Sequence, residues 1–80
     1  MKLTVDLLVN LAQEIEKTDP VLVDNDVDRN LAYHIIASQL VEMSKKEVDQ
    51  DTLILLASVL KLSYENFVLQ HRILNGSTNR

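Results

Sequence analysis

The sequence predicts an all-α protein, a small bundle of three main helices with a long C-terminal helix. One glycine and one proline in 80 residues leave little material for tight turns, whereas residues with high helix propensity are abundant. Apolar residues also recur at spacings of three and four in three separate segments. A chain of this length forms one domain, which we expect to span residues 1–75, with residues 76–80 as a flexible tail.

Residues 4–17 form the first predicted helix, because their apolar side chains share one helical face. That face consists of Val5, Leu8, Leu11, Ala12 and Ile15. Residues 18–20 should end the helix, since the residue before Pro20 is pushed away from helical angles. In the connection that follows, Asn25, Asp26 and Asp28 are candidate N-caps for the next helix.

Residues 27–43 form the second predicted helix, which carries two apolar rows. One row contains Tyr33, Ile36, Ala37 and Leu40, and the other contains Val27, Leu31 and Ile35. Lys45 and Lys46 suit the C-terminus of this helix. Residues 44–47 also fit a capping box, so a short helical turn beginning there is the alternative.

The third predicted helix follows a candidate N-cap, Asp49 or Asp51, and carries two apolar stripes. The first stripe is Leu53, Ala57, Leu60, Tyr64, Phe67, His71 and Leu74. The second stripe is Leu55, Val59, Leu62, Asn66, Leu69 and Ile73. At about 100° per residue the stripes lie about 200° apart, on nearly opposite sides of the helix. Asn75 and Gly76 are expected to end this helix.

The second stripe has no place in a closed three-helix bundle, where each helix buries one broad apolar arc. Complete burial of its aliphatic side chains would contribute about 1.5–3 kcal/mol each. We therefore expect another surface to cover the second stripe, either a second copy of this chain or a different protein. Asn66 either sets the register of that contact or lies exposed at the edge of the stripe.

An alternative fold breaks the last helix near Ser63 and forms four helices, so that both stripes face one interior. The segment TLILLASVLKLSYENF, residues 52–67, resembles the helices that close many helix-turn-helix repressor domains, where such a break occurs. The resemblance covers about a fifth of the chain and no part of a recognition helix. It therefore supports only the broken-helix alternative and transfers no function.

Composition and charge argue against several classes of partner. The net charge is −4 and, of the eight Lys and Arg residues, only Lys45 and Lys46 are adjacent, so we expect no nucleic-acid partner. Asp6 interrupts the apolar region that a signal peptide needs, and the nearly apolar run from Leu53 to Leu60 is short for a membrane span. We expect a cytoplasmic protein that does not bind membranes.

No motif in the sequence predicts catalysis or a cofactor. Asp24, Asp26 and Asp28 begin like a calcium loop, but Arg29 and Ile35 occupy the positions that require Gly and Glu. There is no cysteine, and the two histidines lie far apart in the sequence. The serines lack the setting of a catalytic nucleophile. We expect no metal, no cofactor, no small-molecule substrate and no enzymatic activity.

The sequence therefore favours a small acidic protein–protein interaction module that regulates, inhibits or assembles a partner protein. It is expected to be a homodimer through the C-terminal helix, with the second stripe as the contact. Acidic residues at the helix ends are expected to steer a basic partner, namely Asp24, Asp26, Asp28, Asp49 and Asp51. The alternatives are a helix-turn-helix-like DNA-binding regulator, an interfacial membrane binder and an accessory subunit of a larger enzyme complex.

Overall fold

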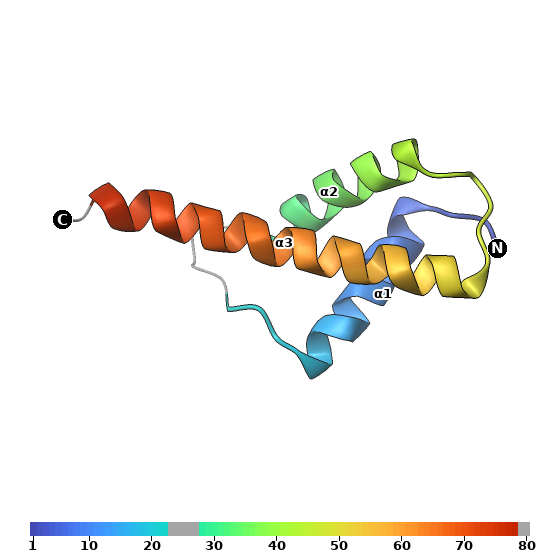
Figure 1. The fold of residues 1–80 in the computed structure, drawn as a ribbon, viewed down its shortest axis with the longest axis horizontal. Coiled ribbons are helices and arrows are strands. Elements are labelled where there is room, and N and C mark those ends of the chain that lie inside the picture. Colours follow the sequence, from blue (N-terminus) through green and yellow to red (C-terminus); the bar gives the residue numbers. More distant parts are fainter. Residues whose placement is uncertain (23–27, 79–80) are drawn as a thin grey trace.

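The protein is a small all-α bundle, as predicted. The computed structural model describes residues 1–22 and 28–78, and over these residues it contains three helices packed against one another. They are α1 (Val5–Thr18), α2 (Arg29–Met43) and α3 (Gln50–Thr78). In Figure 1, α1 crosses behind α3, α2 lies along one side of α3, and the C-terminal part of α3 extends beyond both. The molecule is accordingly elongated, with extents of 48 × 25 × 16 Å.

Each helix begins where a side chain accepts the first unpaired backbone N–H groups. Thr4, Asp28 and Asp49 each accept from the backbone N–H three residues further on, at 3.2, 3.1 and 2.7 Å. The hydrogen bonds from Thr52 also hold the pKa of Asp49 below its usual value. The predicted caps Asp28 and Asp49 are thus confirmed, and α1 ends at Thr18 as expected.

The long C-terminal helix is confirmed, because α3 is continuous through Ser63. The four-helix alternative is therefore wrong. The predicted stop at Asn75 and Gly76 is also wrong, since α3 runs on to Thr78. One glycine inside a helix costs only about 1 kcal/mol relative to alanine, which a helix of this length tolerates. The predicted caps Asn25 and Asp26 lie outside the described residues, as does the predicted helix start at Val27.

The connection between α2 and α3 is an extended segment and not the alternative helical turn from Ser44. Lys2 and Glu47 form an isolated antiparallel bridge. Beside it the Leu3 backbone N–H donates to the Lys46 carbonyl oxygen at 2.8 Å. The bridge joins the N-terminal segment to the connection between α2 and α3, and it places the Leu3 side chain in the core.

The core contains apolar side chains from all described segments. Its buried members are Leu3, Leu8, Val9, Ala12, Val21, Tyr33, Ala37, Leu53, Ala57, Leu60, Tyr64 and Val68. The predicted face of α1 is confirmed, with its other members partly buried against this cluster. On α2 the row that contains Tyr33 and Ala37 faces the core, whereas Leu31 and Ile35 of the other row are 57% and 51% exposed.

The first stripe of α3 is buried only as far as Tyr64. Beyond it Phe67 and Leu74 are exposed, His71 is half-buried, and Val68 is buried instead. A straight α-helix drifts by about 20° per heptad relative to a strict seven-residue repeat, so the contact line moves away from the stripe. Residues 20–22 run beside Val68 and cover it. The expectation of one packed stripe along the whole helix was therefore wrong.

A polar cluster lies inside the core where the helices meet. The Tyr33 and Tyr64 rings stack with centroids 4.3 Å apart. The Tyr33 hydroxyl donates to the buried Glu16 carboxylate, which also pairs with Arg29 at 2.7 Å. Burial, reinforced by the bond to Glu16, raises the pKa of Tyr33 far above its ordinary value. The Tyr64 hydroxyl is equally buried and makes no hydrogen bond of ordinary geometry among the described residues, and burial raises its pKa while the nearby Arg29 guanidinium opposes that rise.

These two tyrosines provide a matched test of the cluster. Tyr33→Phe leaves the buried Glu16 carboxylate short of a donor, so we expect the free energy of unfolding to fall by about 1–3 kcal/mol. Tyr64→Phe removes only a buried hydroxyl that makes no ordinary hydrogen bond among the described residues, so we expect a change below about 1 kcal/mol, or a gain. Urea denaturation of both variants at neutral pH measures the difference. Equal losses would contradict this account of the cluster.

Candidate interaction surface

The second stripe lies exposed along the side of α3 that faces away from the bundle. Its aliphatic members are Leu55 (64% exposed), Val59 (38%), Leu62 (59%), Leu69 (50%) and Ile73 (67%), and Asn66 is exposed among them. The core-facing residues of α3, such as Ala57 and Tyr64, are fully buried on the opposite side. The folded chain therefore presents one continuous row of large aliphatic side chains to its surroundings.

The borders of the second stripe carry little charge. Ser58, Ser63 and Gln70 flank its length, and Glu65 is the carboxylate beside it. Of the charged residues of α3, Lys61 is turned into the bundle and Asp51 lies in the first turn, whereas Glu65 and Arg72 adjoin the second stripe with opposite charges. A face of this kind favours contact with another apolar surface over contact with a charged one.

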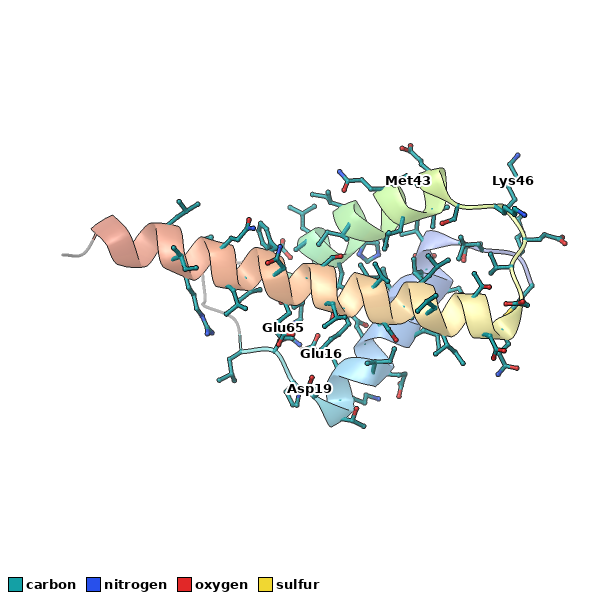
Figure 2. The ribbon with its side chains drawn as sticks, viewed as in Figure 1. Glu16, Asp19, Met43, Lys46 and Glu65 are labelled. Carbon is teal, nitrogen blue, oxygen red and sulfur yellow. The ribbon has the colours of Figure 1, made fainter. Side chains whose placement is uncertain are left out.

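A groove between α2 and α3 adjoins the second stripe. It holds about 300 Å³ and is lined by Ile36, Gln39, Leu40, Met43, Ser63, Asn66, Phe67 and Gln70. Asn66 belongs to both surfaces, so the groove and the stripe are continuous. Met43, at the end of α2 in Figure 2, is 84% exposed. The sequence pattern did not predict this groove, because it assigns Phe67 to the first stripe, which was expected to be buried.

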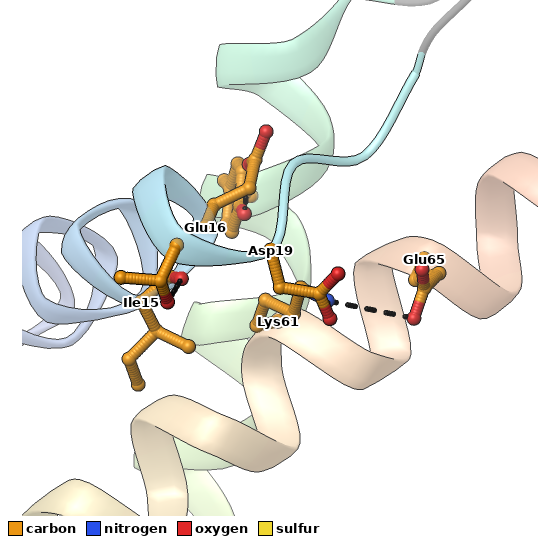
Figure 3. A network of polar contacts seen from close by, with 7 residues as sticks. Ile15, Glu16, Asp19, Lys61 and Glu65 are labelled. Atoms are coloured by element: carbon orange, nitrogen blue, oxygen red, sulfur yellow. Dashed lines mark hydrogen bonds and ion pairs between the residues drawn. The ribbon is translucent and has the colours of Figure 1, made fainter.

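Lys61 helps to fix which side of α3 faces outward. Its side chain is 3% exposed, and its ammonium lies 2.7 Å from Asp19 and 3.6 Å from Glu65. Figure 3 shows these two carboxylates converging on Lys61 from α3 and from the residue after α1. The whole side chain is thus covered, and the two carboxylates compensate its buried charge. The hydrogen bond to Asp19 raises the pKa of Lys61.

The acidic residues expected to steer a partner have local roles where the structure describes them. Asp28 and Asp49 accept backbone N–H groups as helix caps, and Asp51 is exposed in the first turn of α3. Asp24 and Asp26 lie outside the described residues. Steering of a basic partner by these carboxylates stays a prediction.

The described residues offer no evident centre for chemistry. Over residues 1–22 and 28–78, no group of three His, Cys, Asp or Glu side chains is placed to hold a metal ion. His34 lies 3.8 Å from Asp6 on the surface, and His71 contacts the Phe67 ring at a centroid distance of 6.4 Å.

Residues 50–74 of α3 are long and apolar enough to cross a membrane by length and composition. The expectation considered only the uninterrupted apolar run, whereas the mean hydropathy of a longer window stays high despite its polar residues. In the segment's most apolar window 33% of the residues are buried inside the bundle, so most of that window is not covered by the rest of the described chain. The chain matches no known family, no curated protein and no solved structure in the three comparisons made.

The Lys61–Asp19 contact makes a pH-dependent contribution to stability. Because the pKa of Lys61 is raised in the folded state, the contribution is complete below the unfolded pKa of about 10.4 and is lost as pH rises through the folded value. Asp19→Asn should lower the free energy of unfolding by about 0.5–1 kcal/mol at pH 7. Urea denaturation at pH 7 and about pH 11 tests this. A deficit that does not shrink at the higher pH would contradict it.

Proposed function

We propose that this protein is a small protein-interaction module that acts as a homodimer through the second stripe of α3. The observation that carries the proposal is the exposed row of five large aliphatic side chains on one face of a continuous helix. Scattered apolar residues are normal on a protein surface, whereas a contiguous apolar patch marks an interaction site. The row winds slowly around α3, as a strict seven-residue repeat does on an α-helix, and so suits another helix as its partner.

The energy available from this face supports a weak dimer. Complete burial of an aliphatic side chain contributes about 1.5–3 kcal/mol, and these are 38–67% exposed, so each contributes about 1 kcal/mol. Two copies together gain about 10 kcal/mol. Association itself costs about 4 kcal/mol or more, so at most about 6 kcal/mol remains, which corresponds to a dissociation constant of about 40 μM or weaker.

The charge of the chain is compatible with a second copy as the occupant. Each chain carries a net charge of −4, so two copies repel one another at long range. A contact made through the second stripe places few like charges opposite each other, because Ser58, Ser63 and Gln70 border it. The acidic groups would stay on the outside of the dimer, where solvent and salt screen them.

The groove between α2 and α3 is the second element of the proposal. Its apolar lining, with Ile36, Leu40 and Phe67, suits the apolar face of an amphipathic helix from a target protein. Regulation, inhibition or assembly of that target would be the biological role. Because the groove shares Asn66 with the second stripe, dimer formation and target binding would influence each other.

A membrane-surface role is the main competing function, because residues 50–74 are long and apolar enough to insert. Helices that lie in a membrane interface usually carry Lys and Arg along their polar face. Here the opposite face of α3 instead builds the core, through Leu60 and Tyr64. Insertion would expose that core, so the observations favour protein association.

A charge placed in the second stripe tests the proposal. In Leu62→Glu a carboxylate would be buried at the contact, so we expect the dimer dissociation constant to rise by about 100-fold or more. Leu62 is 59% exposed, so the monomer should keep its fold. Sedimentation equilibrium over a range of concentrations measures the change, with circular dichroism as the check on folding.

Ile54→Glu is the matched control, since Ile54 is 46% exposed on the same helix but lies outside the second stripe. We expect its dissociation constant to stay within a few-fold of the unsubstituted protein. A protein that is monomeric at every concentration would contradict the homodimer. Flotation with neutral liposomes that is lost in Leu62→Glu would assign the second stripe to membranes instead.

A further inference from the structure

The residue types of the second stripe follow the rule for one kind of helix pair. In heptad notation its members alternate between positions a and d, and no other position contributes. Position a holds Val59, Asn66 and Ile73, and position d holds Leu55, Leu62 and Leu69. β-Branched residues at position a combined with leucine at position d favour a coiled coil of two parallel helices over one of three or four helices.

We propose that a second copy of this chain lies parallel and in register along α3, with the two Asn66 side chains facing each other. The proposal rests on the homodimer proposed above and adds its orientation, its register and the residue that selects them. Positions 55 to 73 span about 27 Å at 1.5 Å per residue, so the contact covers most of the exposed length of α3.

Asn66 distinguishes the parallel arrangement from the antiparallel one. Parallel helices in register pair each a position with the same position of the second copy, so the two Asn66 amides meet. Each amide offers both a donor and an acceptor, and the pair can satisfy one another. Antiparallel helices pair a with d, which would set Asn66 against Leu62 of the second copy. A desolvated amide without a partner would then oppose association.

The flanking positions are compatible with the parallel arrangement. In a parallel pair, position g of one helix lies near position e of the next heptad in the other. These contacts are Ser58 with Ser63 and Glu65 with Gln70, none of which brings like charges together. They contrast with the Glu and Lys residues that usually occupy such sites, so orientation here depends on Asn66.

The bundle also leaves room for this arrangement. The buried residues Ala57, Leu60 and Tyr64 occupy positions f, b and f, on the side of α3 opposite to a and d. A helix added along the second stripe therefore displaces nothing in the core. The C-terminal part of α3 projects beyond α1 and α2 in Figure 1, and residues 20–22 lie beside Leu69 and Arg72.

Cysteine cross-linking tests the orientation directly, because the chain has no cysteine of its own. In a parallel dimer in register, the thiols introduced by Leu69→Cys lie side by side within disulfide range. We expect mild oxidation to convert this variant into a disulfide-linked dimer. In the antiparallel arrangement, position 59 faces position 69, so the disulfide would form between Val59→Cys and Leu69→Cys. Mixing these two variants, with one carrying a mass tag, detects it.

The outcomes separate this inference from the homodimer. Disulfides within the Leu69→Cys variant, in preference to mixed disulfides, support the parallel dimer. A dimer in sedimentation whose only disulfides are mixed would overturn the orientation and leave the homodimer standing. Absence of any dimer in sedimentation would overturn both. Each reaction is run at protein concentrations below and above the dissociation constant. Cross-linking within dimers follows the dimer population, whereas cross-linking by random collision does not.

Asn66→Leu tests the selecting residue. Removing the polar pair should tighten association about tenfold and relax selectivity, so that mixed disulfides and species larger than a dimer form. The same change in Asn10→Leu, at an exposed position of α1, is the control and should alter neither property. Cross-linking that stays equally selective in the Asn66→Leu background would overturn the role assigned to Asn66.

Discussion

The structure depends on a mismatch between the lengths of its helices. α3 has 29 residues, whereas α1 has 14 and α2 has 15. Two short helices can cover one face of a long helix, but they cannot surround it. The core therefore forms along a single side of α3, and large aliphatic residues elsewhere on that helix stay exposed however well the bundle packs. The exposure of the second stripe is a direct consequence of this geometry.

Which side of α3 faces inward is decided by polar contacts as well as by apolar packing. The Glu16 carboxylate joins Tyr33 and Arg29 inside the bundle, and the Tyr33 ring stacks on Tyr64 of α3. Lys61 adds a contact from α3 to Asp19 at the end of α1. A rotation of α3 about its axis would break these contacts and strand buried charge, which is costly. The rotation of α3, and with it the exposed face, is therefore held firmly.

The resulting molecule has an acidic surface with one nearly neutral apolar face. In the proposed interaction role, the net charge would oppose nonspecific association and the apolar face would make the specific contact. β-Branched residues and asparagine alternate with leucine along that face. This pattern favours some orientations of a partner helix over others, which a uniform apolar surface would not do. Orientation and partner number can be selected by one amide at Asn66, at the expense of some affinity.

The sequence by itself determined the all-α class, the placement of the helices, the caps at Asp28 and Asp49 and the existence of two opposed stripes on α3. These features are local, since they depend on spacing along one helix and on hydrogen bonds three residues apart. Only the tertiary structure decided that the first stripe leaves the core after Tyr64, that Lys61 and Glu16 are buried and that a groove opens beside Phe67. Those outcomes depend on where the other helices end and on how far the apolar stripe drifts around a straight helix. The spacing of residues within one segment gives no information about where the other helices end.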